Sequence, residues 1–109
     1  MTKKEFKIMR NERDVKENVK RVLRAAQPTC WWFMPVASGY GRAGIPDFVG
    51  CVNGHMFAVE TKYGHGAATP MQVNELAAVN AAGGHTWIVR ETSFDAWANE
   101  FVGWVALCS

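Results

Sequence analysis

The sequence predicts a single α/β domain whose sheet contains both antiparallel and parallel strands. Three features carry this prediction: an amphipathic helical pattern near the N-terminus, an Asn53-Gly54 turn between two apolar runs, and a capped helical segment followed by another apolar run. A length of 109 residues with 49% hydrophobic and 20% charged residues fits one globular domain. No repeat, low-complexity tract or linker divides residues 1–109, so the whole chain is expected to form that domain.

The first expected element is a helix that starts at Asn11. Its apolar residues recur at spacings of three and four, which is the stripe of an amphipathic helix. They are Val15, Val19, Val22, Leu23 and Ala26. Gln27-Pro28 should end the helix, because the residue before a proline is disfavoured in helical geometry.

Three strands are expected next. Residues 30–37 are apolar and aromatic, and Pro35 restricts such a strand to a sheet edge or a bulge. Residues 47–52 and 55–62 flank Asn53-Gly54, the preferred pair for a type I′ turn, whose central residues both need positive φ. These two runs are therefore predicted to form an antiparallel hairpin.

The last expected elements are a helix, a strand and a second helix. Thr69 offers an N-cap before a proline and a third-position glutamine, which together predict a helix from Pro70 to about Ala82. Gly83-Gly84 supplies the stop. Thr86 to Arg90 should be a strand parallel to the hairpin, because a helix makes the connection. A final helix is expected around Ser93 to Phe101.

The positive charge is concentrated at one end of the chain. Residues 1–24 hold nine Lys or Arg against four Asp or Glu, whereas residues 25–109 hold three against six. Such a basic segment can bind a polyanion such as DNA by releasing counterions from its phosphates. A solvated helix face is the plainer explanation of the charge taken alone.

Several protein classes are excluded by composition. No apolar run reaches the length of a membrane span, and the basic N-terminus lacks the apolar block of a signal peptide, so no membrane association and an intracellular location are expected. Cys30, Cys51 and Cys108 are odd in number and widely spaced, which argues against a disulfide framework or a structural zinc site. We expect buried, reduced thiols.

The hairpin register converts a sequence pattern into a geometric prediction. A two-residue turn at Asn53-Gly54 pairs Val52 with His55, and the same register puts Asp47 opposite Glu60. Opposed residues point to one face with Cβ atoms roughly 4.5–5.5 Å apart, where like charges destabilise the pair. Something cationic should therefore compensate the two carboxylates.

Lys62 lies two residues beyond Glu60, so strand alternation aims its ammonium along the same face. Hard divalent ions such as Mg²⁺ bind carboxylate oxygens, and a lysine nearby can position an attacking water and stabilise a phosphoryl transition state. Without the inferred register, an exposed polar face with Asp47 in a turn would be the simpler interpretation. With the register, a hydrolytic site is favoured.

These residues resemble a known family. Gly44-Ile-Pro-Asp47, a hairpin and Val59-Glu-Thr-Lys62 look like the PD-(D/E)xK nucleases of the VRR-NUC type, and most like stand-alone, phage-type members similar to Holliday junction resolvases. The similarity continues through Gly64 to Ala68, Gln72 and Gly83-Gly84, and it covers roughly residues 11 to 92. It implies a restriction-endonuclease-like fold, with an α-β-β-β-α-β core and helices flanking a mixed central sheet.

The resemblance also implies an activity, a metal and partners. The activity is Mg²⁺- or Mn²⁺-dependent endonucleolytic hydrolysis of DNA, often branched or junction DNA. The metal ligands would be Asp47, Glu60, the backbone carbonyl of Thr61, and an acid on the first helix. Glu12 fits that last position best, with Asp14 and Glu17 as alternatives, and Lys62 would assist the attacking water. The resemblance to resolvases implies a homodimer. The expected location is the cytoplasm, which for a phage protein is the cytoplasm of the host cell.

Three further residues are candidates near this site. Gln72 is explained equally by a capping box with Thr69 and by an active-site role that the family often gives this position. Arg42 is a candidate phosphate contact and His65 a candidate DNA contact, although plain surface loops explain both.

Two other readings of the chain were weighed. Gly39-Tyr-Gly-Arg-Ala-Gly44 matches the GxGxxG dinucleotide fingerprint, but Pro46 and a strand follow it instead of a helix, so NAD binding is rejected. The alternative to an enzyme is a DNA-binding module that kept the fold without catalysis. The presence of Asp47, Glu60 and Lys62 favours the enzyme.

Overall fold

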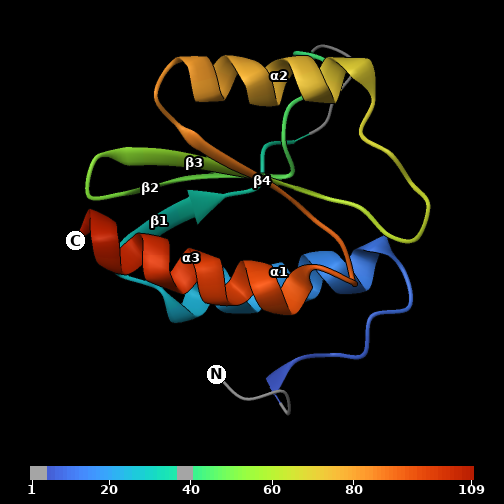
Figure 1. Ribbon diagram of the computed structural model, residues 1–109, viewed down its shortest axis with the longest axis horizontal. Helices are drawn as coiled ribbons and strands as arrows, with labels where there is room; N and C mark the ends of the chain where they lie inside the picture. The colour runs from blue at the N-terminus through green and yellow to red at the C-terminus, as the bar shows by residue number, and fades with distance from the viewer. Residues whose placement is uncertain (1–4, 37–40) are drawn as a thin grey trace.

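The computed structural model describes residues 5–36 and 41–109, and these residues form an α/β fold (Figure 1). The elements in chain order are α1 (Glu12–Ala25), β1 (Cys30–Phe33), β2 (Phe48–Val52), β3 (His55–Thr61), α2 (Pro70–Ala81), β4 (His85–Val89) and α3 (Phe94–Cys108). This is the predicted order. Part of the predicted loop, Ser38 to Tyr40, and the last residue of the predicted first strand, Ala37, lie outside the described residues.

The four strands form one mixed sheet in the order β1-β2-β3-β4. β1 and β2 pair antiparallel, as do β2 and β3. β3 and β4, which α2 connects in the chain, pair parallel. The predicted hairpin register is confirmed, since Val52 pairs with His55 and Phe48 with Val59. Asn53 and Gly54 both adopt positive φ, 48° and 85°, as a type I′ turn requires.

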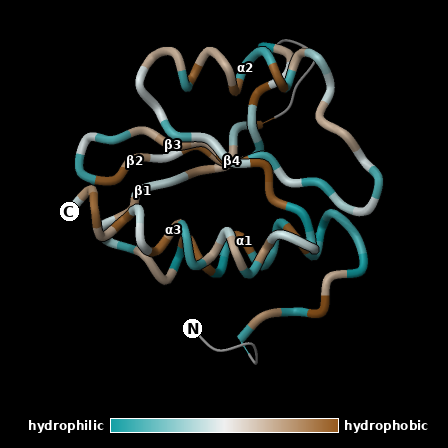
Figure 2. Tube along the Cα trace, in the orientation of Figure 1, coloured by the Kyte–Doolittle hydropathy of each residue, from teal (hydrophilic) through white to brown (hydrophobic). Residues whose placement is uncertain are grey.

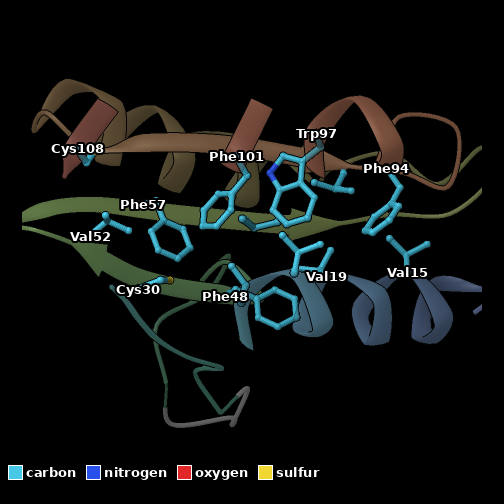
Figure 3. Packing of buried hydrophobic residues seen from close by; sticks show 14 residues of the cluster. Val15, Val19, Cys30, Phe48, Val52, Phe57, Phe94, Trp97, Phe101 and Cys108 are labelled. Atoms are coloured by element: carbon cyan, nitrogen blue, oxygen red, sulfur yellow. The ribbon is translucent and has the colours of Figure 1, made fainter. Parts of the chain in front are cut away.

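The helices cover the two faces of the sheet unequally. In Figure 1, α1 and α3 lie on one face and α2 lies alone on the other. Phe48, Val52 and Phe57, which alternate toward α1 and α3, are fully buried, and Trp32 and Trp87 pack partly buried against them. In Figure 3 the fully buried side chains share one layer with Val15 and Val19 of α1 and with the aromatic residues of α3. The main hydrophobic core therefore lies between the sheet and the α1–α3 pair.

The N-terminal helix is fixed by its cap and by one buried amide. Asn11 caps α1 by accepting a hydrogen bond from the Asp14 N–H at 2.9 Å. Asn18 is fully buried, and its carboxamide exchanges two hydrogen bonds of 2.8 Å with the backbone of Lys7. Hydrophobic and hydrophilic residues alternate along this helix (Figure 2), so its apolar stripe faces the core while its charges other than Asp14 remain near solvent.

Element boundaries differ from the sequence predictions at a few places. β1 ends at Phe33, before Pro35, and it occupies the sheet edge that the proline predicts. α3 continues to Cys108 instead of ending near Phe101, because Trp104 and Val105 prolong its core-packing stripe. No helix within residues 5–36 and 41–109 has both the length and the apolarity needed to cross a membrane.

The cysteines are free, as predicted, but not all are buried. Cys30 and Cys108 are buried, whereas Cys51 is partly exposed. Burial raises the pKa of the Cys30 thiol to about 11, and the neighbouring Cys51 adds to that rise. Cys30 is therefore a protonated, unreactive core residue at neutral pH.

Candidate active site

The hairpin brings Asp47 and Glu60 together. Asp47 directly precedes β2 and Glu60 is the penultimate residue of β3. Continuing the observed register by one position past Phe48 and Val59 places the two acids opposite each other. Each carboxyl group shifts the pKa of the other, which places the two in one electrostatic pair. Two acids that are 13 positions apart in sequence thus form one pair at the end of the sheet where β2 begins and β3 ends.

Asp47 is held by Thr61 in its ionised form. Its Oδ2 accepts hydrogen bonds from the Thr61 N–H at 2.9 Å and from the Thr61 hydroxyl at 2.6 Å. Burial by itself would raise the pKa of Asp47, but the hydrogen bonds from Glu60 and Thr61 and the charge of Lys16 outweigh that effect and lower it. Asp47 is therefore the anionic member of the pair.

Glu60 is the protonated member of the pair. Its side chain is among the largest fully buried ones, with 1% of the residue exposed, and its Oε2 finds no hydrogen-bond partner in the part of the chain that the structure describes. Burial, followed by the hydrogen bond and the charge of Asp47, raises the pKa of Glu60 to about 8. The pair therefore shares one proton near neutral pH.

Lys16 of α1 supplies the cation nearest to Asp47. Its Nζ lies 3.7 Å from Asp47 Oδ1 and 3.0 Å from Glu12 Oε2. Burial would lower the pKa of Lys16, but the hydrogen bond from its ammonium to Glu12 and the charges of Asp47, Glu12 and Glu60 raise it instead. The sequence did not single out Lys16, because a lysine on a basic helix resembles any solvated charge. The available signal was its position one turn after Glu12, beside the apolar stripe.

Lys62 directly follows β3 at the same end of the sheet. Its backbone N–H donates to the carbonyl of Val89 at 3.0 Å, which fixes the chain at this point against β4. The charge of Lys62 acts on Glu60 by lowering its pKa, although burial and Asp47 prevail. In the described residues the Lys62 ammonium makes no ion pair, so it is available to a ligand at this site.

Of the three candidate acids on α1, Glu12 alone lies beside the site, through its contact with Lys16. Asp14 is 4% exposed, and it accepts the Arg10 N–H at 3.0 Å while pairing with the Lys7 ammonium at 3.4 Å. Glu17 pairs with Lys20 at 2.9 Å. Asp14 therefore binds the segment before α1 and Glu17 pairs within the helix, which leaves Glu12 as the α1 acid that is linked to Asp47 through Lys16.

Gln72 takes part in the predicted capping box. Its Oε1 accepts the Thr69 N–H at 2.9 Å, and its own N–H donates to the Thr69 hydroxyl at 3.2 Å. Gln72 and Asp47 also line the same cavity of about 460 Å³, between α2 and the loop that leads into β2. Gly44 holds that loop against α2 at positive φ, where a Cβ would lie 2.5 Å from the Met71 backbone.

The two predicted substrate contacts lie in the loops before β2 and after β3. Arg42 lines the same cavity, and its guanidinium binds Glu75 of α2 through Nη2 at 2.9 Å. Any phosphate would therefore compete with Glu75 for this arginine. His65 is exposed in the loop after Lys62, a loop that Glu91 holds by accepting the Gly64 N–H at 3.0 Å.

The donor set of the site suits a hard divalent cation, although a ready-made cage is absent. Among residues 5–36 and 41–109, no group of three or more His, Cys, Asp or Glu is arranged to hold a metal ion. Mg²⁺, however, typically takes only one or two carboxylates and keeps several waters. Asp47 and Glu60 supply two carboxylates, and the buried Glu60 Oε2 lacks the partner that such an atom requires. The residues present therefore fit such an ion.

Comparison with protein-family models and with curated protein sequences finds no match to this chain.

Proposed function

We propose that this protein is a divalent-metal-dependent endonuclease that hydrolyses DNA phosphodiester bonds, with a restriction-endonuclease-like fold of the VRR-NUC type. One observation carries the proposal: two carboxyl groups, Asp47 and Glu60, lie opposite each other at a sheet end, and one buried oxygen of Glu60 has no partner among residues 5–36 and 41–109. The mixed sheet flanked by helices is compatible with this fold.

The acid pair is costly for a purely structural feature. An unsatisfied buried polar atom destabilises a fold by about 1–3 kcal/mol. Two opposed carboxylates would also repel each other, and the pair avoids that repulsion only by keeping a proton on Glu60. Apolar residues at positions 47 and 60 would avoid both costs. Pairs of acids with pKa values pushed apart are typical of sites that bind or transform a ligand. A cation-binding role accounts for this pair.

In the proposed site, Asp47 and Glu60 hold Mg²⁺ or Mn²⁺, and the backbone carbonyl of Thr61 is a further candidate ligand. When bound, such an ion supplies acidified water and charge neutralisation at phosphorus. Thr61 keeps Asp47 ionised and oriented through its two hydrogen bonds. Lys62, at the same sheet end, orients the attacking water and stabilises charge on the phosphate.

DNA as the substrate is supported by charge. Residues 5–11 and α1 together carry most of the basic residues of the chain. The contact of Lys16 with Asp47 places this helix at the site. The preference for branched or junction DNA and the homodimeric state rest on the resemblance to resolvases. Light scattering of the purified protein tests the dimer, and a monomer across the accessible concentration range would contradict it.

The activity is tested on supercoiled plasmid and on a synthetic four-way junction, with a linear duplex of the same arm sequence as reference. We expect cleavage in Mg²⁺ or Mn²⁺, none in EDTA, and a loss of at least about 10²-fold in Glu60→Gln and Lys62→Ala, since each removes a group used at the reacting centre. Glu100→Gln, on the exposed side of α3, is the matched control and should keep wild-type activity.

The outcomes separate the candidate functions. Cleavage that persists in EDTA or in Glu60→Gln would contradict the mechanism. Junction binding without cleavage in either metal would favour the non-catalytic DNA-binding module. Equal cleavage of junction and linear duplex would leave the nuclease in place and remove the structure selectivity.

A further inference from the structure

We propose that Lys16 is a resident cation of this centre, so that each chain binds one divalent ion and not two. In the same arrangement Glu12 acts as the positioning residue for Lys16, not as a metal ligand. This inference rests on the proposed function, because it assigns a role to residues around the proposed metal.

The contacts of Asp47 define where an ion can bind. Its Oδ2 already accepts two hydrogen bonds from Thr61, and its Oδ1 faces the Lys16 ammonium at 3.7 Å. The buried oxygen without a partner belongs to Glu60. The vacant coordination position is therefore at Glu60.

Lys16 occupies the place that a second ion would need. Two-metal centres hold their ions about 3.5–4 Å apart and bridge them with a shared carboxylate. The natural bridge here is Asp47, but its outer oxygen is already in contact with an ammonium. A second divalent ion at that oxygen would meet a fixed positive charge at contact distance. As long as Lys16 is present, the second position is closed.

Glu12 fixes this arrangement from the helix side. It lies one turn before Lys16, and its Oε2 accepts the ammonium at 3.0 Å. The Glu12 side chain is 42% exposed, which suits an ion-pair partner better than an inner metal ligand. Glu12, Asp47 and Glu60 do not form a three-acid group able to hold an ion, although all three belong to the described residues. The ammonium between Glu12 and Asp47 explains this.

Lys20 offers a matched control on the same helix. Its side chain is 23% exposed against 28% for Lys16, and it makes one ion pair, to Glu17 at 2.9 Å. Removing the Lys20 charge thus changes the net charge and the helix as removal of Lys16 does. The difference is that Lys20 makes no contact with Asp47.

The test is the number of Mn²⁺ ions bound per chain in the absence of DNA, measured by calorimetric titration and by electron paramagnetic resonance of free Mn²⁺. We expect one ion in the wild type, in Lys20→Gln, in Lys16→Arg and in Glu12→Gln. We expect two in Lys16→Gln, because the second position opens. Circular dichroism establishes that each variant is folded, and if Lys16→Gln is not, Glu12→Gln decides.

Each remaining outcome contradicts a defined statement. Two ions in the wild type, or one in folded Lys16→Gln, would overturn the role of Lys16 and leave the nuclease proposal standing. Loss of the ion in Glu12→Gln would make Glu12 a metal ligand and overturn the inference. No Mn²⁺ binding by the wild type would overturn the metal centre itself, and the role of Lys16 with it.

Discussion

The two faces of the sheet are built for different purposes. The face toward α1 and α3 carries the main hydrophobic core, in which the rings of Phe57 and Phe101 meet edge to face with their centroids 5.2 Å apart (Figure 3). The face toward α2 has fewer packed side chains. Leu76 is the one buried residue of α2, and Trp31 on this face is 62% exposed. The acid pair belongs to this face. Because the packed core and the acid pair lie on different faces, packing on one face can offset the free-energy cost of the acid pair on the other.

Truncation of an aromatic residue in the core should show the largest effect on stability. Phe57 is fully buried, and its ring lies against Phe101 and Trp104. Phe57→Ala should lower the free energy of unfolding by about 3–5 kcal/mol, whereas Trp31→Ala should cost less than about 1 kcal/mol because that ring is mostly exposed. Urea denaturation measures both. Similar losses in the two variants would remove the distinction between the faces.

Much of this asymmetry could be predicted from the sequence. Local signals carry it: the Asn53-Gly54 turn fixed the register, and with it the faces of Phe48 and Glu60. The contribution of Lys16 could not be predicted, because only the packing of α1 on the sheet brings this helix to Asp47. Arg42 is similar, since its partner Glu75 is 33 residues away.

The pH dependence of stability tests the acid pair directly. The folded pKa of Glu60, about 8, exceeds its ordinary value of 4.5, so between these values the folded state binds a proton that the unfolded state has lost. This contribution is fully present below about pH 4.5 and is lost as the pH rises through about 8. The lowered pKa of Asp47 acts oppositely, through stability lost at acid pH. The metal-free protein should therefore be most stable in weak acid.

Between pH 5 and pH 9 the free energy of unfolding should fall by on the order of 2–4 kcal/mol, measured by urea denaturation in EDTA. Glu60→Gln carries no titrating group at this position and should flatten the curve over the same range. Restoring Mn²⁺ at pH 9 should recover stability in the wild type alone, because the ion replaces the lost proton. A wild-type curve without this slope, or an equal slope in Glu60→Gln, would contradict the shared-proton description of the pair.

The smallest effect concerns Gln72, where a cap and an active-site role predict different results. Thr69→Ala removes the hydroxyl that accepts the Gln72 N–H and should destabilise the protein by about 0.5–2 kcal/mol. Gln72→Ala removes the reciprocal bond to the Thr69 N–H, so a similar or smaller loss of stability is expected.

If capping is the whole role of Gln72, the two variants should lose little DNA cleavage at a temperature where both are folded. A cleavage defect in Gln72→Ala that Thr69→Ala lacks would assign the Gln72 carboxamide to the site, consistent with the cavity that it lines with Asp47. Comparing the pair at matched stability separates the two roles, because a loss of the cap is common to both.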